Sequence, residues 1–149
     1  MSETIKITYL SKEIDKLKYI EGKSDWIDLR SAENRTLNKG EFALIDLGVS
    51  MSLPDGYELI LAPRSSTFAN FGLIQTNSIG VVDESYGKTS DKDVLKMPVY
   101  ATRDTEIKVN DRICQFRVQK HQPQIVFEEL QVGELNGQER SGFGSTGKQ

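Results

Sequence analysis

Residues 41–51, EFALIDLGVSM, decide the fold, because they form a long β-favouring run directly after the turn residues Asn38-Lys39-Gly40. The run is followed by Pro54-Asp55-Gly56, where proline presets φ and glycine accepts a positive φ, so a turn is expected. Residues 57–61 then resume a strand. Two strands joined by a tight turn are the start of an antiparallel β structure.

The same pattern recurs outward along the chain: short apolar runs alternate with turn residues, and long helical periodicity is nearly absent. Further strands are expected at residues 4–10, 113–118 and 125–130, the last of which would close the core. One short helix is expected at residues 66–70, capped by the hydroxyl of Ser65 or Ser66. The sequence therefore predicts an all-β fold with one short helix.

Composition sets the broad class of protein. The chain has 149 residues, which suits a single domain, and its 19 Lys and Arg against 22 Asp and Glu give a net charge of −3. That balance argues against a general nucleic-acid binder. Because there is no signal-peptide core and no apolar stretch near the roughly 20 residues of a membrane helix, we expect a soluble cytoplasmic protein without membrane contact.

Cysteine and histidine each occur once, which limits the kinds of catalytic and metal site that the chain can form. Cys114 is the one cysteine, so an internal disulfide and a multi-cysteine zinc site are excluded. His121 is the one histidine, and a serine–histidine hydrolase would have to work through it. Its polar surroundings, Lys120-His121-Gln122-Pro123, favour an ordinary surface histidine.

The segment APRSST, residues 62–67, places a guanidinium beside hydroxyl groups at the end of an expected strand. Arg64, Ser65 and Ser66 there could bind a phosphate, since arginine offers a planar fork of donors and the amides of a helix start add positive potential. Taken alone, the segment fits an ordinary surface loop better.

A second segment, NSIGVVDESYG at residues 77–87, delivers the carboxylate of Asp83 directly after two valines. A carboxylate at the end of an apolar strand is partly desolvated, which raises its basicity and suits a general base acting on water. Asn77 carries both a donor and an acceptor, as the reading of a nucleobase edge requires. A simple turn with Asp83 as a turn former fits the segment equally well.

Two more segments carry groups that could contact a ligand. Gln115 projects from the strand face opposite Cys114, so it reaches either a ligand or solvent. Residues 133–149 are rich in glycine and poor in apolar side chains, which is typical of a frayed terminus. The exposed aromatic Phe143 within GFGSTG instead favours a mobile arm that closes over an anion and a flat partner.

Together these segments resemble the trimeric deoxyuridine triphosphate nucleotidohydrolases (dUTPases). The resemblance spans residues 24–147 and rests on five motifs in the family's order. They are SDWIDLR (24–30), PRSS (63–66), GVVDESY (80–86), NDRICQ (110–115) and GFGSTG (142–147). Each motif is a weak signal, whereas five in order form a strong one.

The resemblance implies a distorted jelly-roll-like β-barrel of residues 1–132 and a mobile arm of residues 133–149 that covers the active site. It implies a homotrimer with active sites shared between chains. It also implies Mg²⁺-dependent hydrolysis of dUTP to dUMP and pyrophosphate, which removes dUTP from the nucleotide pool and supplies dUMP for thymidylate synthesis.

The resemblance further implies a role for each matching residue. Asp83 would orient the water that attacks the α-phosphorus, and Tyr86 would lie under the deoxyribose. Asn77, with the hairpin backbone of Gly80, Val81, Val82 and Asp83, would read uracil. The phosphates would be held by Arg64, Ser65, Ser66 and Gln115.

The metal and the tail complete the implied site. Asp28 would contact Mg²⁺ through water, the ion being held mainly by substrate phosphates. Phe143 would stack on uracil, and the γ-phosphate would be covered by Gly144, Ser145, Thr146 and Gly147.

Several positions differ from the family pattern. Asp25 and Trp26 stand where the family has two small residues, Gly87 comes one position early, and residues 88–93 form a polar insertion. Arg140 lies closer to Phe143 than the family's tail arginine does.

Two other functions are compatible with the sequence. A dCTP deaminase of the same fold would need a carboxylic acid near the base, and Glu84 is the neighbouring candidate. A non-enzymatic module that senses nucleotides or binds proteins could use residues 88–93 as a partner surface.

Overall fold

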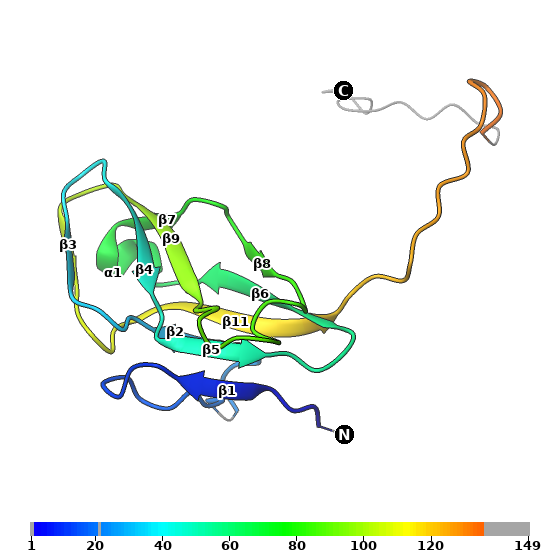
Figure 1. The fold of residues 1–149 in the computed structure, drawn as a ribbon. Coiled ribbons are helices and arrows are strands. Elements are labelled where there is room, and N and C mark those ends of the chain that lie inside the picture. Colours follow the sequence, from blue (N-terminus) through cyan, green and yellow to red (C-terminus); the bar gives the residue numbers. More distant parts are fainter. Residues whose placement is uncertain (1, 21, 136–149) are drawn as a thin grey trace.

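The computed structural model describes residues 2–20 and 22–135, and within these ranges the chain forms eleven β-strands and one short helix (Figure 1). The strands are β1 (Lys6–Tyr9), β2 (Ile27–Arg30), β3 (Arg35–Leu37), β4 (Phe42–Asp46), β5 (Val49–Ser52), β6 (Tyr57–Pro63), β7 (Leu73–Gln75), β8 (Gly80–Val82), β9 (Lys96–Ala101), β10 (Thr105–Ile107) and β11 (Arg112–Lys120). The helix α1 (Thr67–Phe71) lies between β6 and β7. Nothing helical in these ranges has the length and apolar character that a membrane crossing needs. The predicted all-β class with one short helix is confirmed.

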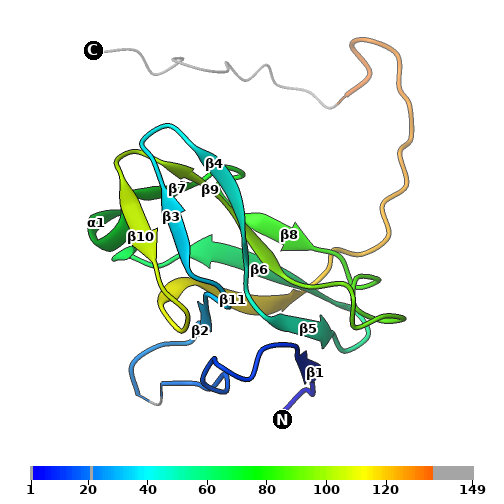
Figure 2. The same ribbon diagram turned by 60° about the vertical axis from the view of Figure 1, so that its left-hand side comes forward.

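The strands pair in an antiparallel manner and form four small sheets (Figures 1 and 2). One sheet has the order β2-β11-β6-β8 and another has the order β4-β9-β7, while β1 pairs with β5 and β10 pairs with β3. This is the packed-sheet arrangement of a jelly roll. The expected barrel is not formed, because the sheets of the described ranges stay separate instead of joining edge to edge.

The core lies between the sheets and is built from aliphatic side chains of almost every strand. Leu29, Ile45, Leu59 and Val99 have no exposed surface. Burial of such a side chain contributes about 1.5–3 kcal/mol relative to leaving it in water. The core therefore holds the short strands together although most of them have only three to six residues.

The stretch 41–51, expected as one strand, is divided between two sheets. β4 alternates between exposed and buried residues, whereas Val49, Ser50 and Met51 of β5 are all buried. The break falls at Gly48, which has a φ of +69°, and a Cβ there would come within 2.8 Å of the Ala32 Cβ. Glycine thus allows both the left-handed backbone and the close packing that turn the chain from one sheet to the next.

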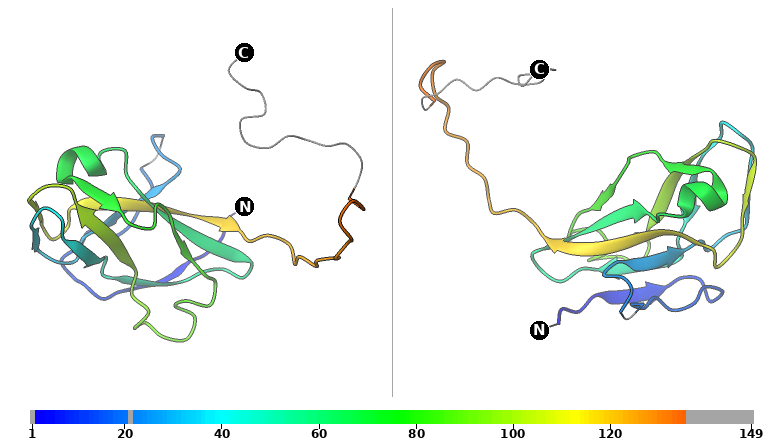
Figure 3. Two further views of the ribbon diagram at one scale, coloured as in Figure 1. Left: turned by 90° about the horizontal axis from the view of Figure 1, so that it is seen from above. Right: turned by 180° about the vertical axis from the view of Figure 1, so that it is seen from behind.

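The strand expected at residues 125–130 is absent. Residues 121–135 leave the end of β11 and run away from the sheets, and every one of them is exposed (Figures 1 and 3). Phe127 is 92% exposed and Val126 is 85% exposed. The prediction of a strand here that closes the core is wrong, because the described part of this chain offers the apolar run neither a strand to pair with nor a core to cover.

Gly87 is fixed by close contact with β5. Its φ is +85°, and a Cβ at this position would lie 2.0 Å from the Met51 carbonyl oxygen. The loop that follows is held by two contacts. The Gly87 N–H donates to Asp93 Oδ2 at 3.0 Å within the loop, and Lys88 Nζ lies 2.7 Å from Asp55 Oδ1 in the turn at residues 54–56. The early glycine and the polar insertion therefore form one anchored loop against β5 and the turn at residues 54–56.

A glycine-to-alanine pair tests this anchor. We expect Gly87→Ala to lower the free energy of unfolding by about 2–4 kcal/mol, because backbone strain adds to a clash that the backbone must relieve. Gly40→Ala is the matched control, because Gly40 has a φ of +93° with nothing within 4 Å of its Cβ position. Its loss should be only about 1 kcal/mol in urea unfolding. Equal losses in the two variants would show that Gly87 is not packed in this way.

Candidate active site

The first part of the site is a charged cluster at the end of β6, which we call the arginine cluster: Asp28, Arg64 and Arg112. Arg64 Nε lies 3.1 Å from Asp28 Oδ1, and Arg112 Nη1 lies 3.4 Å from Asp28 Oδ2. Arg64 Nη1 also donates to the Arg112 carbonyl at 3.2 Å. Two guanidinium groups around one carboxylate leave a net positive charge, which suits an anionic ligand.

The register of β11 brings this cluster together. β11 pairs with β2 on one side and β6 on the other, so Gln115 stands opposite both Asp28 and Ala62. Its Nε2 donates to the Pro63 carbonyl at 3.1 Å. Two of the predicted phosphate-binding residues, Arg64 and Gln115, and the predicted metal contact Asp28 are therefore neighbours in space although they lie far apart in sequence.

The start of α1 is built differently from the expectation. Ser66 occupies the N-cap position but makes no side-chain capping bond. Thr67 Oγ1 instead accepts the Arg64 N–H at 2.8 Å and donates to the Ile113 carbonyl at 2.9 Å. This buried threonine holds the turn that carries Arg64, while Ser65 is exposed and Ser66 is half-buried beside it.

Cys114, next to Gln115, takes no part in nucleophilic chemistry. Its side chain is fully buried, and burial raises the pKa of its thiol well above the ordinary range. The thiol therefore stays protonated and serves as an apolar core group.

The second part of the site is the segment that runs from β7 through β8, which we call the hairpin and which carries Asn77, Gly80, Val81 and Val82. Its strands do not pair with each other as a true hairpin would, because β7 pairs with β9 and β8 pairs with β6. Ser78 takes a φ of +63° at its tip, and the Ser78 N–H donates to the Gln75 carbonyl at 3.1 Å. β8 pairs with β6, where Gly80 stands opposite Leu61. Asn77 is exposed, and its Oδ1 accepts a bond from the buried Gln75, a residue that we did not expect in the site.

Asp83 follows β8 directly and is exposed to solvent. Its Oδ2 accepts bonds from the Ser85 hydroxyl at 2.5 Å and from the Ser85 N–H at 3.0 Å. These bonds, the hydroxyl first, lower the pKa of Asp83 below its ordinary value. The expectation of a desolvated carboxylate with raised basicity is therefore wrong for this chain: Asp83 is exposed, and its hydrogen bonds favour the ionised form further.

Asp83 lies on a groove of about 360 Å³ whose lining includes Val81, Tyr86, Val94 and Lys96. The Tyr86 hydroxyl donates to the Val94 carbonyl at 2.9 Å, which fixes the ring. Partial burial, with Asp93 nearby, raises the pKa of Tyr86, so the phenol stays neutral. The groove thus combines an ionised carboxylate with apolar and aromatic surface.

Glu84 anchors the Asp83 loop to the rest of the fold. Its Oε1 accepts the Gly56 N–H and lies 3.4 Å from His121 Nε2, and the His121 N–H donates to the Gly56 carbonyl at 3.1 Å. His121 is therefore a half-exposed surface residue, as expected, with a structural contact. Glu84 is engaged in the same contact, so it is not a free acid for chemistry on a base.

Within one chain the two parts lie apart. Val82, beside Asp83, stands opposite Leu59, which is five residues before Arg64 on the same run of chain. At about 3.3 Å per residue, this separates the two parts by roughly 16 Å along β6. The structure thus gathers the arginine cluster and builds the Asp83 hairpin, but it does not bring them together. Phe143, Gly144, Ser145, Thr146, Gly147 and Arg140 lie outside the described residues.

The surface thus carries two features: a positively charged cluster that suits an anion, and an ionised carboxylate beside an apolar groove. Residues 21–147 match the dUTPase family. A prophage-derived deoxyuridine 5′-triphosphate nucleotidohydrolase of Bacillus subtilis is 51% identical over 143 residues, covering 96% of this chain and 97% of the relative. The Finegoldia magna deoxyuridine 5′-triphosphate nucleotidohydrolase is 34% identical, covering 96% of this chain and 99% of the relative.

Solved structures agree on the fold. A dUTPase variant of Staphylococcus bacteriophage 80alpha with dUpNHpp matches with a TM-score of 0.79 at 19% identity, covering 98% of this chain and 99% of that chain. A dUTPase variant of S. aureus phage phi11, described with a structural Mg(II) ion, matches with a TM-score of 0.74 at 17% identity, covering 87% of this chain and 98% of that chain. The chain belongs to the dUTPase family.

The role of Ser85 is directly testable. Ser85→Ala removes the hydroxyl bond that most lowers the pKa of Asp83, so that pKa should rise toward its ordinary value. NMR titration of the Asp83 carboxyl carbon, assigned with Asp83→Asn, measures the shift. Ser90→Ala is the control, because the Ser90 hydroxyl accepts the Lys92 N–H in the same loop and makes no bond to Asp83. An unchanged titration in Ser85→Ala would contradict the assignment.

Proposed function

We propose that this chain hydrolyses dUTP to dUMP and pyrophosphate. The observation that carries the proposal is the match of residues 21–147 to the dUTPase family, a span that contains both the arginine cluster and the Asp83 hairpin. The curated relatives with 51% and 34% identity are named as deoxyuridine 5′-triphosphate nucleotidohydrolases.

Asp83 directs the water in this reaction. The carboxylate is exposed and its pKa is lowered from an ordinary value that already lies far below neutral pH, so it is ionised and accepts a hydrogen bond from water. The water oxygen forms a bond to the α-phosphorus while the bond from that phosphorus to the bridging oxygen breaks, and pyrophosphate leaves. The proton released from water passes to Asp83 and then to solvent. Arg64, Ser65, Ser66 and Gln115 hold the phosphates, so catalysis rests on positioning and charge neutralisation.

The hairpin supplies the nucleoside site. Asn77 and the backbone of Gly80, Val81 and Val82 bind uracil, and Tyr86, held by its bond to the Val94 carbonyl, lies under the deoxyribose. A fixed aromatic ring at that place leaves no space for a ribose 2′-hydroxyl. This part of the proposal rests on the motif match and on the fixed geometry of the hairpin.

Mg²⁺ is the metal that the family implies. No group of three acidic, histidine or cysteine side chains gathers among the described residues. Asp28 lies in the arginine cluster with each of its oxygens facing an arginine, which fits contact with the ion through water. Mg²⁺ keeps several waters and is commonly held by substrate phosphates with one or two carboxylates, so this donor set suits it. When bound, the ion neutralises phosphate charge.

We also propose a homotrimer in which each active site takes the Asp83 hairpin from one chain and the arginine cluster from another. The roughly 16 Å between the two parts along β6 supports it, because water directed by Asp83 must contact the α-phosphorus. Exposed apolar surface supports it too: Phe42 and Ile74 flank Tyr100 on the outer face of the β4-β9-β7 sheet, and all three are exposed.

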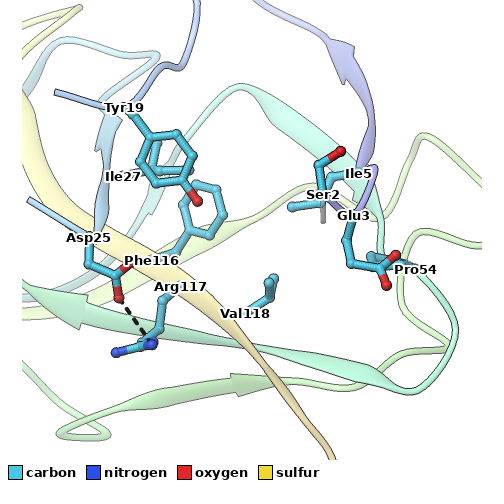
Figure 4. Close-up of a pocket in the computed structure, with 10 residues that line it drawn as sticks. All are labelled: Ser2, Glu3, Ile5, Tyr19, Asp25, Ile27, Pro54, Phe116, Arg117 and Val118. Carbon is cyan, nitrogen blue, oxygen red and sulfur yellow. Dashed lines mark ion pairs between the residues drawn. The ribbon is translucent and has the colours of Figure 1, made fainter. Parts of the chain in front are cut away.

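A cavity between the N-terminal segment and the β2-β11-β6-β8 sheet offers further surface for a second chain (Figure 4). Its volume is about 470 Å³, and Ile5, Ile27 and Phe116 line it together with the Asp25–Arg117 ion pair. In this assembly, residues 1–132 form the β domain and residues 133–149 form the arm over the site. Phe143 of the arm stacks on uracil, and residues 144–147 cover the γ-phosphate.

A nucleotide panel with and without Mg²⁺ tests the activity. We expect pyrophosphate release from dUTP that falls on chelation of the metal. Asp83→Asn should lower kcat by at least about a hundredfold while calorimetry still detects dUTP binding. Intact dUTP after incubation with the wild-type protein would refute the activity, and ammonia release from dCTP would instead favour the deaminase.

Mixing two inactive variants tests the shared site. Asp83→Asn and Arg64→Ala, unfolded together and refolded as a mixture, should recover about a quarter of wild-type turnover, because one site in four then pairs an intact hairpin with an intact cluster. Arg64→Ala mixed with Gln115→Ala is the control, since both changes fall in the phosphate-binding part and no mixed site is complete. Absence of recovery in the first mixture would place the whole site in one chain.

A further inference from the structure

The residue of interest is Gln75, the last residue of β7, which is only 3% exposed. A buried side-chain amide costs free energy unless its polar atoms are bonded. The Gln75 Nε2 donates to two acceptors, whereas its buried Oε1 has no partner among the described residues. The fold thus leaves one polar atom unsatisfied and keeps the Nε2 bonds, so these bonds constrain the hairpin.

The orientation of the Gln75 amide is set by the backbone. Its Nε2 donates to the Leu61 carbonyl oxygen at 3.0 Å. A carbonyl oxygen only accepts hydrogen bonds, so the nitrogen of Gln75 must face it, and the reversed amide would place two oxygens together. Leu61 stands opposite Gly80 in the pairing of β6 with β8, which locates this bond at the base of the hairpin.

The same nitrogen then sets the orientation of Asn77. Gln75 Nε2 donates to Asn77 Oδ1 at 2.9 Å, so Asn77 must turn its oxygen toward Gln75. Its Nδ2 therefore lies on the other side, next to Gly80, where an added Cβ would be 3.4 Å from it. The Leu61 carbonyl thus orients the Gln75 amide, and the Gln75 amide orients the Asn77 amide. As a result, Asn77 presents an N–H donor at a fixed place on the hairpin.

We propose that Gln75 is a positioning residue that makes Asn77 present an N–H donor to the base and so selects a carbonyl-bearing pyrimidine over an amino-bearing one. The inference rests on the proposed function, in which Asn77 contacts the base. Uracil carries a carbonyl oxygen at the ring position where cytosine carries an amino group. A fixed N–H bonds to the first and opposes the second, and discrimination of this kind is strong when the donor cannot turn around.

Gln75→Met tests the role, with kcat and KM measured for dUTP and for dCTP. Without the donor, the Asn77 amide can take either orientation, so it can accept a bond from cytosine. We expect kcat/KM for dCTP to rise about tenfold, and that for dUTP to fall only about two- to threefold through KM with kcat kept. Gln119→Met is the control, since exposed Gln119 bonds to Glu58 at the far end of β11 and should leave both values unchanged.

Gln75→Glu is the second variant, and it keeps the size and polarity of the side chain. The oxygen that replaces Nε2 in a protonated glutamic acid has one hydrogen for two acceptors. When it donates to the Leu61 carbonyl, its lone pairs face Asn77, so the Asn77 amide turns its Nδ2 toward residue 75. The preference for dUTP over dCTP should then fall further than in Gln75→Met. If Gln75→Met fails to fold, the same ratio measured in Gln75→Glu decides the question.

The outcomes separate this role from the proposed function. Equal losses for both nucleotides, or an unchanged ratio, in variants that melt near the wild-type temperature would reduce Gln75 to a structural tie between β7 and β6. A wild-type protein that hydrolyses neither nucleotide would refute the proposed function instead. Binding of dUMP and dCMP, measured by calorimetry, checks the same preference without catalysis.

Discussion

The antiparallel register of β11 between β2 and β6 is the constraint on which the rest of the site depends. Gln115 stands opposite Asp28 in β2 and Ala62 in β6. Because successive side chains on a strand point to opposite faces, a slip of one residue would turn Gln115 away from this surface and bury a polar group. Cys114 and Phe116, its neighbours, are buried. The same apolar burial that stabilises the sheet therefore fixes the arginine cluster.

The positive charge that suits phosphates and the negative charge proposed to direct water lie at different places on the chain. Asp28 lies between Arg64 and Arg112, so the cluster is partly neutralised before any ligand arrives and a phosphate must share its donors. Asp83 accepts a hydrogen bond from the Ser85 hydroxyl and lies at the other part of the site. A second carboxylate beside Asp28 inside the cluster would repel a triphosphate and pair with the arginines. Separation along β6, which a second chain closes in the proposed trimer, avoids both losses.

Much of this could be predicted from residues, and the failures have physical causes. Local pattern predicted β1, β4, β5, β6 and β11, but it missed β9 and the three-residue strands β3, β7 and β10. Arginine beside hydroxyls singled out the segment that carries Arg64, although that segment taken alone fitted a surface loop better. The division of residues 41–51 depends on the contact of Gly48 with Ala32, and the missing strand at 125–130 depends on a partner that the described chain lacks. The pKa of Asp83 was misjudged because burial was weighed and the Asp-x-Ser turn, which puts a hydroxyl on the carboxylate, was overlooked.

Gln75 was overlooked, and the packing that requires the early Gly87 was not foreseen, for a common reason: each residue faces a backbone oxygen that no sequence pattern shows. The Leu61 carbonyl sets the orientation of the Gln75 amide. The Met51 carbonyl leaves no space for a side chain at position 87, so this position requires glycine. The two residues flank the hairpin that carries Asn77 and Asp83. Gln75 is the last residue of β7, and Gly87 follows the loop after Asp83. A backbone oxygen in a packed sheet cannot turn or move far. The hairpin is thus aligned against fixed points of β5 and β6, so its polar groups are oriented before a nucleotide arrives, and little ordering remains to be done on binding.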